Sequence, residues 1–145
     1  MNFKKIKDPW IAKEKFSNIS KVTTKLSLDK WVGFVESHLD YFTWLEETDK
    51  GKRTLANLES IPESFREGVL KSHNKQQACA EFNRNKGYHE LIVQFNNRLG
   101  VIGTTFQKPI TRDHLRMLLA MANHLDAYLL NNGTEIIDER VIEGL

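Results

Sequence analysis

Two apolar runs separated by a short polar break constrain the fold of this chain most strongly. Residues 90–95 and 99–106 are rich in β-branched and aromatic side chains, and the break between them, Asn96-Asn97-Arg98, is typical of a turn. The two runs therefore predict an antiparallel hairpin. Gly100 and Gly103 lie in its second strand, where glycine is unfavourable unless a bulge or a close neighbour requires it.

An amphipathic helix is expected directly after the hairpin. Thr111 is a good N-cap, and Asp113 places a negative charge in the first turn, where the helix dipole favours it. Apolar side chains then recur every three or four residues over about residues 112–131: Leu115, Leu118, Leu119, Ala122, Leu125 and Leu129. Gly133, after two asparagines, is expected to end this helix in the left-handed conformation.

The N-terminal half allows two interpretations. Its apolar residues fit one helix of about 20 residues that starts at Ser27. The rival is a helix to about residue 39, then a strand over 41–45, a turn over 49–52 and a second strand over 53–58. Periodicity alone does not choose between them.

A short helix is expected after Pro62, because proline suits the first helical turn. Residues 73–87 follow as a polar stretch with one aromatic side chain, Phe82, besides histidine. No repeat and no Gly/Ser-rich linker occurs, so nothing divides the central body into two domains.

Charge is unevenly distributed along the chain. Residues 1–25 hold seven lysines against Asp8 and Glu14, whereas residues 26–145 hold 14 lysines and arginines against 17 acidic residues. This pattern predicts a basic N-terminal arm, residues 1–26, which is either solvated or docked on an acidic body by its own apolar side chains. Because the arm has no arginine and no interleaved aromatic platform, nucleic acid is not an expected partner.

Composition restricts the cellular setting. One cysteine, Cys79, excludes an internal disulfide. No run of 18 uncharged apolar residues occurs, so we expect no membrane span, and the lysine-rich start lacks the apolar run of a secretory signal. A cytoplasmic protein with no membrane partner is therefore expected.

Four motifs follow one another in a fixed order after residue 90. They are Leu91-Ile92-Val93-Gln94-Phe95, Gly100-Val101-Ile102-Gly103, Pro109-Ile110-Thr111-Arg112-Asp113-His114-Leu115, and Leu118-Leu119-Ala120-Met121-Ala122-Asn123-His124-Leu125. This order resembles the C-terminal half of a GAF domain, the small-molecule sensor module of many signalling proteins. Gln94 stands where the family often has proline, Ile110 replaces the usual aromatic residue, and His114 replaces an acidic one.

The resemblance extends over about residues 27–131 and implies an α+β fold of the GAF/PAS type. Its antiparallel sheet would carry the N- and C-terminal helices on one face, with 41–48 and 53–59 as the first two strands. The domain would then comprise residues 27–132, and residues 133–145 would be a C-terminal tail: an edge strand, a partner-binding segment or a segment packed on the body.

In this register, helices and loops of residues 61–87 would cover a ligand pocket. Candidate lining residues are Trp44, His73, Cys79, Phe82 and His89. Only fragments of the family's cyclic-nucleotide signature occur, so a cyclic nucleotide is not the expected ligand.

No catalytic constellation is found. The sequence lacks a Gly-x-Ser-x-Gly elbow, a phosphate-binding Gly-Lys-Ser/Thr loop and a paired-histidine metal motif. Cys79 could act as a redox or nucleophilic thiol, but it has no second cysteine as a resolving partner. We therefore expect no catalytic residue, no metal site and no cofactor.

Two functions remain. The first is a non-enzymatic, stand-alone regulatory domain that binds a small molecule or a protein partner and signals through complex formation, including a homodimer. The second is a small interaction protein of the immunity or inhibitor type, which neutralises one protein partner without a ligand.

Overall fold

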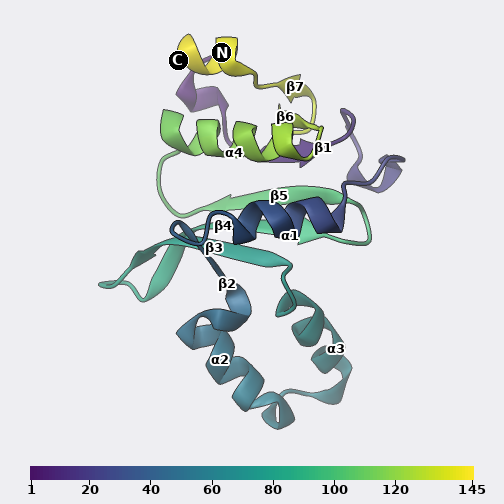
Figure 1. Ribbon diagram of the computed structural model, residues 1–145, viewed down its shortest axis with the longest axis vertical. Helices are drawn as coiled ribbons and strands as arrows, with labels where there is room; N and C mark the ends of the chain where they lie inside the picture. The colour runs from purple at the N-terminus through teal and green to yellow at the C-terminus, as the bar shows by residue number, and fades with distance from the viewer.

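The computed structural model describes residues 1–145 and contains one seven-stranded sheet (Figure 1). All neighbouring strands pair antiparallel, in the order β2-β3-β4-β5-β1-β6-β7. The strands are β1 (Pro9–Ala12), β2 (Phe42–Trp44), β3 (Gln77–Asn83), β4 (Tyr88–Asn96), β5 (Val101–Phe106), β6 (Tyr128–Asn131) and β7 (Glu135–Ile136).

Five α-helices accompany the sheet, which confirms the mixed α+β class. They are α1 (Leu28–Glu36), α2 (Asp49–Ala56), α3 (Glu63–Ser72), α4 (Arg112–His124) and α5 (Glu139–Glu143). α1 and α4 contact each other on one side of the sheet, whereas α2 and α3 extend away from its β2 edge (Figure 1). None of the helices combines the length and the apolar character needed to cross a bilayer.

The main core lies between α1, α4 and the sheet. Along β4, Leu91, Val93 and Phe95 alternate as buried residues of this core, because side chains two apart in a strand share one face. Trp31 from α1 and Leu118 from α4 are fully buried against them. A smaller cluster, built on Ala12, Val101 and Leu130, lies on the opposite face.

The predicted hairpin is confirmed as β4 and β5, with Phe95 opposite Ile102. Gly100, with a φ of 72°, lies in the turn and not in the second strand. Gly103 lies within β5, where a Cβ would come 3.0 Å from Cζ3 of Trp10. A close neighbour therefore explains the glycine at position 103.

α4 begins as predicted but ends earlier. Thr111 caps it: the hydroxyl accepts a hydrogen bond from the His114 N–H, while the His114 ring accepts one from the Thr111 N–H. The helix ends at His124 and not near residue 131, because Asp126 is left-handed (φ 55°) and the chain continues as β6. Leu129 is buried in the same core from β6, so the apolar stripe continues across the boundary.

Residues 41–59 follow neither interpretation completely. α1 ends at Glu36, so one helix of about 20 residues is wrong. β2 supplies the first expected strand, but the second is wrong, because most of residues 53–58 lie in α2. Thr48 caps that helix by accepting a hydrogen bond from the Gly51 N–H. α3 confirms the helix expected after Pro62.

The segments expected to lie outside the central domain both contribute to the sheet. From residues 1–26, β1 lies between β5 and β6, and Ile11 is completely buried. From residues 133–145, β7 forms the sheet edge, and Ile137 and Ile142 are buried in the main core. Gly133 is left-handed as expected (φ 82°), but it lies in the turn between β6 and β7 and does not end a helix.

Candidate functional site

The five residues predicted to line a pocket lie in several places. Phe82 and His89 face each other across the β3–β4 hairpin, with ring centroids 4.9 Å apart. Trp44 is buried in the main core, 5.9 Å from the Trp31 ring. His73 follows the last turn of α3, where its ring Nδ1 lies 2.7 Å from the Val69 carbonyl. None of these residues lines the cleft described below.

The fifth residue, Cys79, is 2% exposed in β3 and lies on the sheet face opposite α1 and α4. Burial raises the pKa of its thiol to about 11, and the nearby Glu46 carboxylate acts in the same direction, whereas Lys50 opposes them. The thiol is therefore protonated at neutral pH, which makes it a poor nucleophile.

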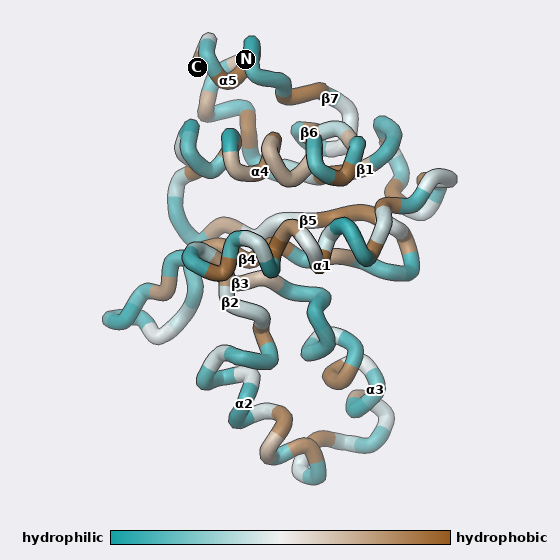
Figure 2. The backbone as a smooth tube through the Cα atoms, in the orientation of Figure 1, coloured by the Kyte–Doolittle hydropathy of each residue, from teal (hydrophilic) through white to brown (hydrophobic).

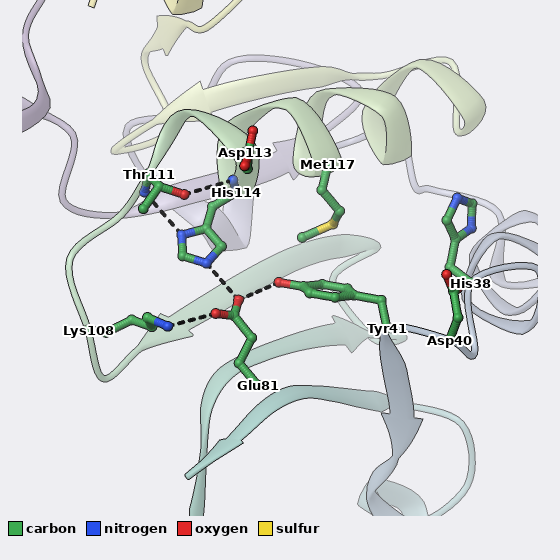
Figure 3. Close-up of a pocket in the computed structure, with 9 residues that line it drawn as sticks. All are labelled: His38, Asp40, Tyr41, Glu81, Lys108, Thr111, Asp113, His114 and Met117. Carbon is green, nitrogen blue, oxygen red and sulfur yellow. Dashed lines mark hydrogen bonds and ion pairs between the residues drawn. The ribbon is translucent and has the colours of Figure 1, made fainter.

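A cleft of about 500 Å³ opens where the first turn of α4 faces the start of β2 and the middle of β3 (Figure 3). Its lining is mainly polar: His38, Asp40, Tyr41, Glu81, Lys108, Thr111, Asp113, His114 and Met117. Three carboxylates and one lysine are among them.

Glu81 connects one side of this cleft into a single network. Its Oε2 accepts hydrogen bonds from the Tyr41 hydroxyl at 2.5 Å and from Nε2 of His114 at 2.6 Å. Its Oε1 lies 2.7 Å from Nζ of Lys108, which also contacts Glu90 at 3.3 Å. Figure 3 shows these side chains converging on the Glu81 carboxylate from three directions.

The backbone of Glu81 is unusual. Its φ of 58° makes it the only non-glycine residue within a strand that adopts the left-handed conformation. In a regular strand Glu81 would point to the face opposite that of its neighbour Ala80, which belongs to the main core. With its left-handed backbone, Glu81 instead extends its carboxylate to the side of the sheet that carries α4. Such a conformation costs about 1 kcal/mol or more, so the surrounding contacts must stabilise it.

The hydrogen bonds of His114 determine its tautomer. Nδ1 lies 3.0 Å from the backbone nitrogen of Thr111, and a backbone N–H can only donate. Nδ1 is therefore the acceptor, and Nε2 carries the proton that is donated to Glu81. The ring is neutral in this arrangement, and it couples the cap of α4 to the carboxylate in β3.

Hydrogen bonds set the charge of the network. Partial burial would raise the pKa of Glu81, but bonds from Lys108, Tyr41 and His114 outweigh it and lower the pKa to about 2. Burial, followed by the bond to Glu81 and its charge, raises the pKa of the Tyr41 hydroxyl. The bond to Glu81 is also the main reason that the pKa of Lys108 is raised. At neutral pH the network therefore contains a carboxylate, a phenol and an ammonium group.

These states restrict what the cleft can do chemically. A carboxylate with a pKa of about 2 and three donors is a weak base, so Glu81 is suited to fixing its neighbours and not to accepting a proton. The other two carboxylates, Asp40 and Asp113, are exposed and form no ion pair. No three His, Cys, Asp or Glu side chains are arranged to hold a metal ion. The charged groups of the cleft that have no ion-pair partner are therefore both carboxylates.

No protein-family model matches the chain, and no curated protein and no solved structure is detectably similar to it. The similarity to GAF domains stays a prediction from the sequence motifs.

Sequence reasoning did not find Tyr41, Glu81 or Lys108 as site residues. His114 stood out in the sequence as a departure from the GAF pattern, and no role in this cleft was predicted for it. A signal for it exists, since it is the third residue of a helix capped by Thr111, where a side chain commonly returns a bond to the cap. Glu81 has no comparable local signal.

Proposed function

We propose that this protein is a non-enzymatic regulatory domain whose cleft binds a small molecule carrying a positively charged group. The observation that carries the proposal is that two carboxylates of the cleft, Asp40 and Asp113, form no ion pair. The third carboxylate, Glu81, is already neutralised by Lys108. The carboxylates and the lysine of the lining contribute three negative charges against one positive, a formal charge of −2. A cationic ligand is therefore favoured electrostatically over an anion.

The fixed part of the site suits recognition better than turnover. Glu81 holds Tyr41, Lys108 and His114 in place before any ligand arrives, which lowers the entropy lost on binding. The ring of Tyr41 and the side chain of Met117 offer apolar contacts for a hydrocarbon portion of the ligand. An amine or guanidinium compound with a short carbon chain fits this combination. A GAF-like sensor role is part of this proposal.

Thermal denaturation with a panel of charged compounds tests the proposal. Spermidine and agmatine serve as cationic probes, and succinate as an anionic one. At ten times its dissociation constant a ligand stabilises the folded state by about 1.4 kcal/mol, which raises the melting temperature of a chain of this size by roughly 3–5 °C.

The double variant Asp40→Asn/Asp113→Asn should abolish the shift. Asp29→Asn is the matched control, because Asp29 lies in the first turn of α1 as Asp113 does in α4, but outside the cleft. A panel with no stabilising cation, or a shift that survives in the double variant, contradicts the proposal.

The α2–α3 region favours a second candidate, an interaction protein that neutralises one protein partner. α3 has no buried residue, yet Phe65 is 65% exposed and Leu70 49% exposed. Figure 2 shows apolar segments in this region, away from the sheet. Exposed apolar side chains that gather in one region of a surface favour an interaction site there.

A partner that copurifies with the protein would test this candidate. Phe65→Ser/Leu70→Ser should release such a partner, whereas Asp40→Asn/Asp113→Asn should retain it. The opposite pattern would assign the partner to the cleft. Elution volume as a function of protein concentration would reveal a homodimer formed through the same helix.

A further inference from the structure

We propose that a second cavity, between the N-terminal segment and the β5–α4 connection, binds a monomeric amphipathic carboxylate such as a medium-chain fatty acid. The cavity has a volume of about 440 Å³. Residues 3–7 supply one wall and residues 106–110 the other. It is separate from the carboxylate-lined part of the first cleft and shares only Lys108 with it.

Apolar side chains form part of the lining of this cavity. Phe3, Ile6, Phe106, Pro109 and Ile110 line it, and Ile6 is buried in the main core while Phe106 and Ile110 pack against that core. The apolar surface is therefore anchored to the rigid body of the protein. Such a surface favours a hydrocarbon chain over a fully polar ligand.

The charged groups of the cavity are all cationic. Lys4, Lys7 and Lys108 line it, and no aspartate or glutamate does. Lys108 is occupied by Glu81 at 2.7 Å and Glu90 at 3.3 Å. Lys4 and Lys7 form no ion pair, so two ammonium groups remain free beside the apolar floor.

This arrangement gives part of the lysine-rich N-terminal segment a specific role. The structure places two of its lysines next to one apolar cavity, instead of distributing them along an open arm. Opposite charge attracts an anion, and the apolar floor requires that the anion carry a hydrocarbon portion. An amphipathic carboxylate satisfies both conditions, whereas a simple inorganic anion satisfies only the first.

Titration of the full chain with decanoate, below the concentration at which it forms micelles, tests the inference. Calorimetry should show saturable binding, and backbone amide NMR signals of Phe3, Ile6 and Ile110 should shift. Decanol, which lacks the charge, and acetate, which lacks the chain, should bind at least about tenfold more weakly, because each keeps one of the two interactions.

Variants locate the binding. Lys4→Gln/Lys7→Gln should weaken decanoate binding roughly five- to tenfold, through loss of two exposed ion pairs. Lys5→Gln/Lys15→Gln removes the same charge from the same segment outside the cavity and should change the affinity less than twofold. All four substituted lysines are exposed, so both double variants should retain the fold.

Three results would overturn the inference. They are no saturable binding of decanoate, equal weakening by the two double variants, and binding to anionic phospholipid vesicles without binding of monomeric decanoate. The last result would mean that the lysines recognise a lipid surface.

Discussion

Replacing Glu81 by glutamine should destabilise the protein in a pH-dependent manner. Glutamine has nearly the same shape, but it removes the charge that attracts Lys108 and accepts hydrogen bonds from Tyr41 and His114. The pKa of Glu81 falls from its ordinary 4.5 to about 2, which sets an upper limit of about 3.4 kcal/mol for the stabilisation of the carboxylate. Because the side chain is 25% exposed, solvent screening reduces the expected loss to about 1–2 kcal/mol.

The sign of the pH dependence follows from the lowered pKa. The carboxylate is ionised more readily in the folded than in the unfolded chain, so its contribution is fully present above about pH 4.5. It is lost as the pH falls through about 2. The difference in free energy of unfolding between the wild-type protein and Glu81→Gln should therefore be constant from pH 7 to 5 and shrink below that.

Urea denaturation at several pH values between 7 and 2.5 measures this difference. Glu67→Gln is the control, because Glu67 forms one exposed ion pair with Lys71 on α3 and should change stability by less than about 0.5 kcal/mol. A Glu81→Gln protein as stable as wild type at pH 7, or a difference that does not change down to pH 2.5, would refute the assigned role of Glu81.

Three further predictions concern the backbone and the thiol. Glu81→Gly should be more stable than Glu81→Ala by about 1 kcal/mol in urea denaturation, since both lose the carboxylate but only glycine relieves the left-handed strain; equal stabilities would argue against strain. Gly51→Ala should lower the free energy of unfolding by more than about 2 kcal/mol, because the alanine Cβ would lie 1.8 Å from the Leu45 carbonyl oxygen. Gly68→Ala in α3 should instead raise this free energy by about 0.5–1 kcal/mol, because its Cβ would meet no atom within 4 Å. Cys79 should resist iodoacetamide at pH 8 in the folded protein and react in urea, as followed by mass spectrometry; rapid labelling of the native protein would contradict its burial and raised pKa.

Local signals explain which parts of the fold could be predicted. Thr111 and the leucine stripe identified α4, and the two apolar runs around Asn96 identified the hairpin, because each signal lies within the element that it specifies. β3 was missed for the opposite reason. Ala78 and Ala80 are small and weak strand formers, and this segment is extended because it pairs with both β2 and β4.

The candidate site was beyond local reasoning for a related reason. The partners of Glu81 lie 40, 33 and 27 positions away, at Tyr41, His114 and Lys108. No spacing rule connects residues at such separations, and a single glutamate in a polar stretch is ordinarily a solvated surface residue. Its left-handed backbone is a tertiary property as well, since glutamate has no intrinsic preference for that conformation.

The position of β1 has a consequence for how this protein is made. Ile11 pairs with Ile102 on one side and with Leu129 on the other, so β1 is synthesised about 90 residues before the first of its two neighbouring strands. The middle of the sheet therefore cannot close on the ribosome until residues 128–131 of β6 have emerged. During that time both edges of β1 and the apolar residues around Ile11 are open to other chains, so we expect the nascent protein to depend on chaperones.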